Sequence, residues 1–134
     1  MIPPRQVDFV RGAPRALLRL EGLVLLAVAT TVYVLQGGGW QMFALLALAP
    51  DLAFVGYAFG RRVGAIAYNT THTTVLPLSL LAAGLLLEHH TLLLVALIWL
   101  AHIGFDRALG YGLKYASAFG HTHLGPIGRD ARST

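Results

Sequence analysis

The chain has 134 residues, of which 56% are hydrophobic and 12% are charged, and its mean hydropathy is +0.65. Soluble domains carry about 25% charged residues, so this composition excludes a water-soluble enzyme, a secreted disulfide scaffold and a disordered tail. The length predicts a single domain, 1–134. The absence of cysteine excludes disulfides, thiolate chemistry and iron–sulfur clusters. The formal net charge of +4 raises nucleic acid as a partner until the basic residues are located.

Four apolar segments are each long enough to cross a membrane as a helix. A span needs about 20 mainly apolar residues, because the hydrocarbon core of a bilayer is about 30 Å thick. The segments cover about 16–35, 39–59, 63–87 and 91–109. Short turns connect them, which favours antiparallel neighbours. The sequence therefore predicts an all-α polytopic membrane protein with an antiparallel four-transmembrane-helix bundle.

The first segment also has the form of a signal peptide, since Ala27-Val28-Ala29 matches a small-x-small cleavage site. We expect it to be retained as a span. The apolar run continues to Leu35, and Arg19 and Glu21 interrupt the region that would be the apolar part of a signal peptide.

All the basic residues lie on one side of the predicted bundle, before the first span, between the second and third, or after the fourth: Arg5, Arg11, Arg15, Arg19, Arg61, Arg62, Arg107, Lys114, Arg129 and Arg132. The side that retains Lys and Arg is normally cytoplasmic. We therefore expect a multi-pass protein of the inner (plasma) membrane with both termini in the cytoplasm. The expected partner is the lipid bilayer and not nucleic acid, and a bundle this small is also a candidate for homo-oligomerisation.

The fourth span is expected to continue into a short interfacial helix, from Ala108 to Phe119, at the start of a cytoplasmic tail, 110–134. This helix would group Tyr111, Lys114 and Tyr115 on one side, at the level of the lipid headgroups. In the loop that follows, His121 and His123 either fold back onto the bundle or stay solvated, and the sequence leaves both readings open.

Polar side chains inside the predicted spans are costly, so they normally face a bundle interior or a cavity. They are Glu21, Asp51, Asn69, His72, His102 and Asp106. Counted from the cytoplasmic turns at about 1.5 Å per residue, they all lie in the inner half of the membrane. His102 and Asp106 are four residues apart, and Asn69 and His72 are three apart, so each pair projects from one face of its helix.

Two prolines are expected to bend helices close to this polar layer. Pro50 cannot donate to the carbonyl of Leu46, and Pro77 cannot donate to that of Thr73, so each leaves an acceptor without its helical partner.

The polar layer predicts a candidate metal site made of Asp51, His72, His102 and Asp106, completed by Glu21 or His123. Imidazole and carboxylate ligands suit a divalent metal such as Zn, Fe or Mn. A metal there would activate water for hydrolysis of a lipid or another amphiphile, with Asp51, His102 and Asp106 as the catalytic residues. Polar and basic residues on the cytoplasmic side are candidates for binding the substrate or its anionic headgroup: Asn69, Arg107, Tyr111 and Lys114, with Arg61 and Arg62.

Three other functions use the same residues. A small-molecule or proton-coupled transporter would exchange protons at His and Asp, although the outer half of the spans offers no polar path. A haem protein would use His72 and His102 as axial ligands. A structural polar layer would only fix helix packing through interhelical hydrogen bonds.

Several stretches resemble a known family: Arg19-Leu-Glu-Gly22, Ala49-Pro-Asp51, Tyr68-Asn69 with His72, the run from Trp99 to Tyr115, and Thr122-His-Leu-Gly125. Together they resemble the small bacterial membrane proteins grouped as a domain of unknown function, DUF4260, from about Arg15 to Arg129. The resemblance implies a multi-span membrane protein without an established activity. It therefore supplies no catalytic residue.

Overall fold

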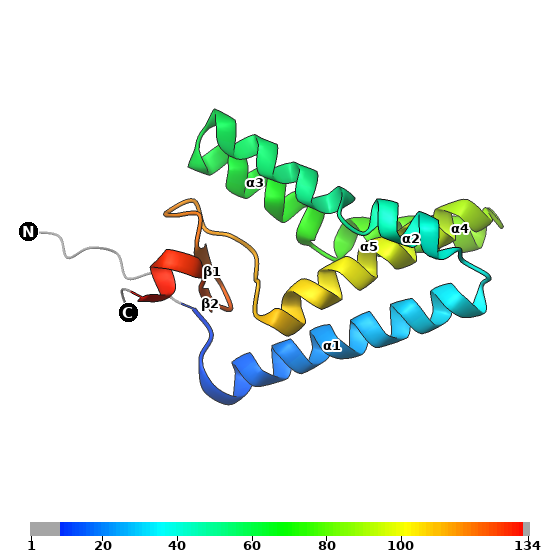
Figure 1. The fold of residues 1–134 in the computed structure, drawn as a ribbon, viewed down its shortest axis with the longest axis horizontal. Helices are drawn as coiled ribbons and strands as arrows, with labels where there is room; N and C mark the ends of the chain where they lie inside the picture. The colour runs from blue at the N-terminus through cyan, green and yellow to red at the C-terminus, as the bar shows by residue number, and fades with distance from the viewer. Residues whose placement is uncertain (1–8, 133–134) are drawn as a thin grey trace, which may run out of the picture.

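The structure, a computed structural model, describes residues 9–132, so the predicted cytoplasmic residue Arg5 lies outside the described range. The described chain is mainly helical, with a small β-hairpin and a short 3-10 helix at its C-terminal end (Figure 1). Its elements are α1 (Gly12–Leu35), α2 (Trp40–Leu46), the 3-10 helix η1 (Ala49–Phe59), α3 (Arg61–His72), α4 (Val75–Leu86), α5 (His90–Leu109), the antiparallel strands β1 (His121–Thr122) and β2 (Gly125–Pro126), and the 3-10 helix η2 (Gly128–Arg132).

Three helical segments of the described chain are long and apolar enough to cross a membrane. They are Gly12–Leu35, Trp40–Phe59, which joins α2 to η1, and His90–Leu109, each with a mean hydropathy of 1.8. The all-α class is confirmed, and the first, second and fourth predicted spans coincide with these segments.

The third predicted span, 63–87, is two separate helices, so a four-span bundle is not confirmed. Thr73, between α3 and α4, has extended backbone angles of φ −82° and ψ 147°. Pro77 then lies in the first turn of α4, where a missing N–H removes no helical hydrogen bond. The expected kink is therefore a complete break four residues before the proline. Beyond it α4 packs on α5, whereas α3 packs on η1.

The bend expected at Pro50 is a change of helix type. α2 ends at Leu46, and Pro50 lies in the first turn of the 3-10 helix η1. In Figure 1, η1 and α3 form an arm that leaves the long axis of α1 and α5 at this point.

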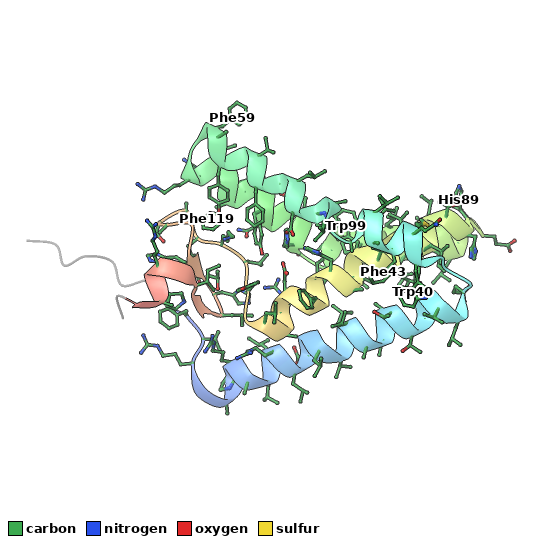
Figure 2. The ribbon with its side chains drawn as sticks, viewed as in Figure 1. Trp40, Phe43, Phe59, His89, Trp99 and Phe119 are labelled. Atoms are coloured by element: carbon green, nitrogen blue, oxygen red, sulfur yellow. The ribbon has the colours of Figure 1, made fainter. Side chains whose placement is uncertain are left out.

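α1 and α5 run side by side over most of their length (Figure 1) and contribute most of the buried core. Their backbones come very close at Gly22 and Gly104. A Cβ atom at Gly104 would lie 2.5 Å from the backbone nitrogen of Leu26 and 2.7 Å from the carbonyl oxygen of Gly22. At the C-terminal end of α1, beside the turn into α2, Trp40 and Phe43 pack against the buried ring of Tyr33. Trp40 and Phe43 are labelled in Figure 2.

The prediction of an interfacial helix from Ala108 to Phe119 is wrong. α5 stops at Leu109 because Gly110 takes the left-handed conformation, with φ 91°, and the N–H of Tyr111 donates to the carbonyl of Asp106 at 2.8 Å. The chain then turns back, and Lys114 forms an antiparallel bridge with Thr122. This tail, residues 110–127, lies between the η1–α3 arm and the start of α1 (Figure 1).

Hydrogen bonds from side chains of two helices, α3 and α1, hold the tail in this position. Asn69 binds both backbone groups of Lys114: its Nδ2 donates to the carbonyl at 2.8 Å, and its Oδ1 accepts from the N–H at 2.6 Å. Nη1 of Arg61 donates to the carbonyl of Ser117, and Nε of Arg15 donates to the carbonyl of Leu124. The tail therefore connects α1 to α3 at the end of the molecule that carries the arginines.

Replacing Asn69 with leucine is expected to detach the tail from α3, because both hydrogen bonds to Lys114 are lost. At about 1 kcal/mol for each bond, the attachment weakens by about 2 kcal/mol. Limited proteolysis should cut residues 110–127 at least tenfold faster in Asn69→Leu than in the wild type. The matched control is Thr70→Ala, since the exposed Thr70 hydroxyl bonds only its own helix, at Ile66. Equal cleavage of the two variants would contradict the attachment through Asn69.

Candidate metal centre

Four side chains from three helices meet where the η1–α3 arm lies closest to α5. Asp51 is in the first turn of η1, His72 is the last residue of α3, and His102 and Asp106 lie one turn apart on α5. One potential ligand atom from each lies within 4.8 Å of all the others. These four residues, called here the His/Asp cluster, are the four that the sequence analysis singled out as core metal ligands.

The distances inside the cluster are short and nearly equal. Nε2 of His72 lies 3.2 Å from Oδ1 of Asp51 and 3.3 Å from Oδ2 of Asp106. Nε2 of His102 lies 3.4 Å and 3.5 Å from the same two oxygens, and the two Nε2 atoms are 3.0 Å apart. All four atoms therefore point at one small volume.

The hydrogen bonding of His72 directs its proton away from the cluster. Nδ1 of His72 lies 2.9 Å from the carbonyl oxygen of Tyr68, which only accepts, so Nδ1 carries the proton and Nε2 carries a lone pair. With His102 in the same tautomer, the cluster presents two imidazole lone pairs and two carboxylates, all acceptors. A cation at their centre turns this mutual repulsion into attraction.

The same geometry matches the coordination shell of a small divalent metal. Metal–nitrogen and metal–oxygen bonds of about 2.0 to 2.1 Å in a tetrahedron separate neighbouring ligand atoms by about 3.3 to 3.4 Å. Five of the six separations among the four atoms are 3.0 to 3.5 Å and bracket that value, and the sixth, between the two carboxylate oxygens, is at most 4.8 Å. The geometry and the ligand types thus suit a Zn, Fe or Mn ion.

Tyr68 supports the cluster and was not selected as a site residue from the sequence. Its ring stacks on that of His72 with 3.7 Å between centroids, and its hydroxyl donates to Oδ2 of Asp106 at 3.3 Å. The available signal was spacing, because Tyr68 is four residues before His72 and shares its helix face. A ligating carboxylate and imidazole are normally oriented by such partners.

The cluster is closed on most sides and open at Asp51. His72 and His102 are 2% and 7% exposed, whereas the side chain of Asp51 is 35% exposed. Asp51 is therefore the ligand at which a small molecule can approach.

Arg107, a predicted substrate-binding residue, lies directly beside the cluster. Its Nη2 donates to the carbonyl of His72 at 3.1 Å. Its Nη1 is buried and has no hydrogen-bond partner among residues 9–132. Because a buried guanidinium N–H normally has a partner, this atom is available to a negatively charged group bound at the cluster.

The other predicted substrate-binding residues lie elsewhere. Asn69 is used by the tail, and Tyr111 is exposed. Lys114 is 5% exposed, its Nζ donates to the carbonyl of Phe119 at 2.8 Å, and it lies 3.6 Å from the centre of the Phe119 ring. Its charge therefore points into the protein, between the tail and the η1–α3 arm.

Neither of the two additional ligands suggested by the sequence belongs to the cluster. Glu21 is exposed on α1, among apolar side chains that include Leu20 and Val24. Nδ1 of His123 accepts a hydrogen bond from the N–H of Leu113 at 2.9 Å, so that lone pair is already used within the tail. Glu21 is therefore not a ligand, because it lies on the exposed side of α1. His123 is not a ligand either, because the hairpin of the tail pairs its ring with Leu113.

Tail attachment is expected to weaken at acidic pH through His123. Burial and the positive charge of Arg107 lower the pKa of His123. When the tail is detached, His123 has an ordinary pKa of about 6.5, so as the pH falls it is protonated more readily in the detached tail than in the attached one. The attachment of the tail is therefore fully stable above about pH 6.5 and becomes weaker as the pH falls below that value. Hydrogen exchange at the amide of Leu113, corrected for the intrinsic rate, should accelerate between about pH 6.5 and 5. In His123→Asn, which keeps an acceptor but does not titrate, the corrected rate should stay constant, and an unchanged pH dependence would contradict this role.

The comparisons agree with the resemblance drawn from the sequence. The model of a family described as "Domain of unknown function (DUF4260)" matches residues 15–127. No curated protein and no solved structure matches the chain at the significance required. The family match includes every member of the His/Asp cluster, so the cluster lies inside the domain that defines the family.

Proposed function

We propose that this chain, which belongs to the DUF4260 family, is an integral membrane protein that binds a divalent metal at the His/Asp cluster and uses it to hydrolyse a lipid or another amphiphile. The observation that carries the proposal is the convergence of two imidazole nitrogens and two carboxylate oxygens at separations of 3.0 to 3.5 Å. Asp51, His72, His102 and Asp106 would hold the ion.

Hydrolysis is supported by the residues at the open side of the cluster. A divalent metal held there would supply a nucleophile at neutral pH by lowering the pKa of water to about 7. Asp51, whose side chain is the most exposed of the four, would act as the general base that takes up a proton from water at the open side. Arg107, through its unpaired Nη1, can hold the negative charge that develops on an ester or phosphoester group.

A structural metal ion is the second candidate. Structural sites have all four positions filled by side chains, whereas catalytic sites keep one position open. The His/Asp cluster supplies four ligands from η1, α3 and α5. An ion bound by all four would fasten the η1–α3 arm to α5 without reacting.

The haem hypothesis is not supported by the geometry. Two axial histidines on one iron would place their nitrogens about 4 Å apart on opposite sides of a macrocycle, at about 2.0 Å per bond. The Nε2 atoms of His72 and His102 are 3.0 Å apart with both carboxylates beside them.

Insertion with both termini in the cytoplasm is supported by the distribution of arginines. Arg15, Arg19 and Arg61 all bind the tail or the end of α5, through the carbonyls of Leu124, Ala108 and Ser117. These residues therefore gather at one end of the apolar helices, as the retention of positive charge in the cytoplasm requires. A reporter fused after Thr134 should be active in the cytoplasm, and activity outside it would contradict this orientation.

The experiment combines metal analysis with an assay for hydrolysis. We expect the purified protein to bind one Zn, Fe or Mn ion and to release the fluorophore from an amphiphilic ester or phosphodiester. Asp51→Asn should lose most of the hydrolysis. Glu88→Gln, which neutralises a carboxylate in the exposed turn before α5, is the matched control and should keep it. Bound metal without any hydrolysis would establish the structural role instead, and absence of metal after loading would refute both.

A further inference from the structure

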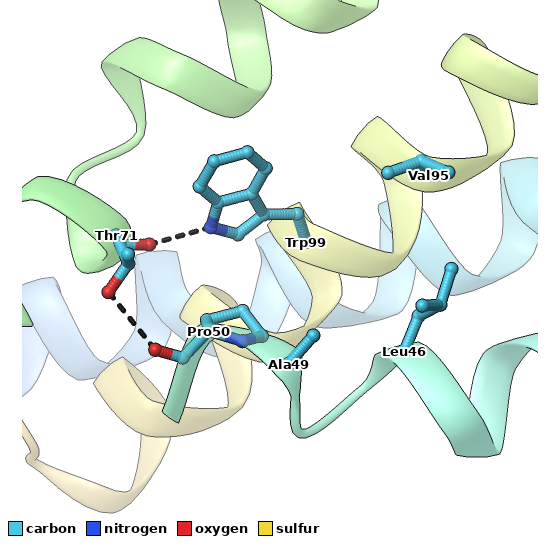
Figure 3. Close-up of a pocket in the computed structure, with 6 residues that line it drawn as sticks. All are labelled: Leu46, Ala49, Pro50, Thr71, Val95 and Trp99. Carbon is cyan, nitrogen blue, oxygen red and sulfur yellow. Dashed lines mark hydrogen bonds between the residues drawn. The ribbon is translucent and has the colours of Figure 1, made fainter. Parts of the chain in front are cut away.

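An apolar cavity adjoins the His/Asp cluster. It has a volume of about 260 Å³ and is formed where α2, η1, the end of α3 and α5 meet (Figure 3). Its walls are Leu46, Ala49, Pro50, Thr71, Val95 and Trp99.

The polar groups in the cavity wall are already paired with each other. Nε1 of Trp99 donates to the carbonyl of Thr71 at 2.6 Å, and the Thr71 hydroxyl donates to the carbonyl of Pro50 at 3.1 Å (Figure 3). Water in a cavity needs two to four polar partners, and this half-open cavity, whose polar groups are already paired, offers it none. The chemistry of this cavity therefore selects an apolar occupant.

The cavity and the cluster share their walls. Pro50 and Thr71 are followed directly in the chain by the ligands Asp51 and His72. Trp99 is three residues before His102 on α5, which places both on one side of that helix. A hydrocarbon chain in the cavity would thus end close to the metal ligands.

We propose that this cavity holds the hydrocarbon chain of an amphiphile whose polar group reacts at the His/Asp cluster. The inference rests on the proposed function and narrows its substrate class to single-chain amphiphiles, such as fatty acyl esters and lysolipids. The volume favours one chain over two, because it lies below the range of about 300 to 1,000 Å³ for ordinary ligand pockets.

The first test uses alkyl hydroxamates, which pair a metal-binding head with a chain of chosen length. Affinity for the zinc-loaded protein should rise about fourfold with each added methylene, since burying one stabilises by about 0.8 kcal/mol, until the cavity is full. Val95→Phe, or Leu46→Phe from the opposite wall, should abolish this increase and leave metal content and acetohydroxamate affinity unchanged. Val55→Phe, on the exposed side of η1, is the control. An unchanged dependence on chain length in both cavity variants would overturn the inference.

The second test does not require a metal. In a Trp40→Phe background, Trp99 is the one remaining tryptophan of the chain. A brominated fatty acid should quench its fluorescence saturably, and Val95→Phe and Leu46→Phe should remove the saturable part. Quenching that never saturates, as ordinary surrounding lipid would give, overturns the inference. Failure to bind metal or acetohydroxamate, with saturable quenching intact, would overturn the proposed function while supporting the cavity.

Discussion

Replacing His102 with alanine is expected to remove the bound divalent metal from the purified protein. Loss of a supporting residue around a metal typically lowers affinity by about 10- to 100-fold, and loss of a direct ligand should cost at least the upper value. His102 is one of two nearly buried imidazoles in the cluster, and the remaining acceptors would then repel one another without a cation.

Metal content per protein, measured by elemental analysis after dialysis against a weak chelator, checks this expectation. The matched variant is His90→Ala, which removes an imidazole from the exposed start of α5. His102→Ala should also unfold at a lower temperature than the wild type in the presence of metal, and at a similar temperature in its absence. Metal retained by His102→Ala at wild-type affinity would show that the cluster is not the binding site.

Replacing Gly104 with alanine is expected to destabilise the protein by about 2 to 3 kcal/mol, near the upper end of the usual cost of overpacking. The added Cβ would lie 2.5 Å from the backbone nitrogen of Leu26 and 2.7 Å from the carbonyl oxygen of Gly22. Neither backbone atom can move unless α1 separates from α5. Because α5 carries His102 and Asp106, the variant should also bind metal less tightly.

The free energy of unfolding, from a denaturant titration in mixed micelles, measures the effect. Gly39→Ala is the control, because Gly39 has a φ of −83° and a Cβ there would meet no atom within 4 Å. It changes only a helix-cap preference, so its cost should stay within about 1 kcal/mol. Equal stability of the two variants would contradict the close crossing of α1 and α5.

The His/Asp cluster could be predicted because its signals are local and were combined with a simple constraint. His102 and Asp106 are one helical turn apart, and the cost of polar groups in apolar segments implies that they face a shared interior. Counting residues from the basic turns then placed Asp51 and His72 at the same level. The same reasoning also included Glu21, because depth alone does not indicate on which side of α1 a residue lies.

The tail could not be predicted in this way, because its structure depends on pairs far apart in the chain. The spacing of Tyr111, Lys114 and Tyr115 suits a helix, but Gly110 ends α5 in the left-handed conformation. Asn69 then binds the backbone of Lys114 across 45 residues, and no periodic pattern reports such a contact.

The break between α3 and α4 was anticipated in position but not in extent. Pro77 indicates an unpaired carbonyl at Thr73. Whether the chain bends or separates there depends on what each half can pack against, and here α3 finds η1 while α4 stays on α5. That separation carries His72 to Asp51 and so completes the cluster.

X-ray absorption spectroscopy of the zinc-loaded protein tests the central claim most directly. We predict a first shell of four nitrogen and oxygen atoms at about 2.0 to 2.1 Å, with outer-shell scattering from two imidazoles. In His102→Ala the scattering from one imidazole should disappear. A shell of water oxygens without imidazole scattering, or a protein that cannot be loaded with metal, would contradict the account.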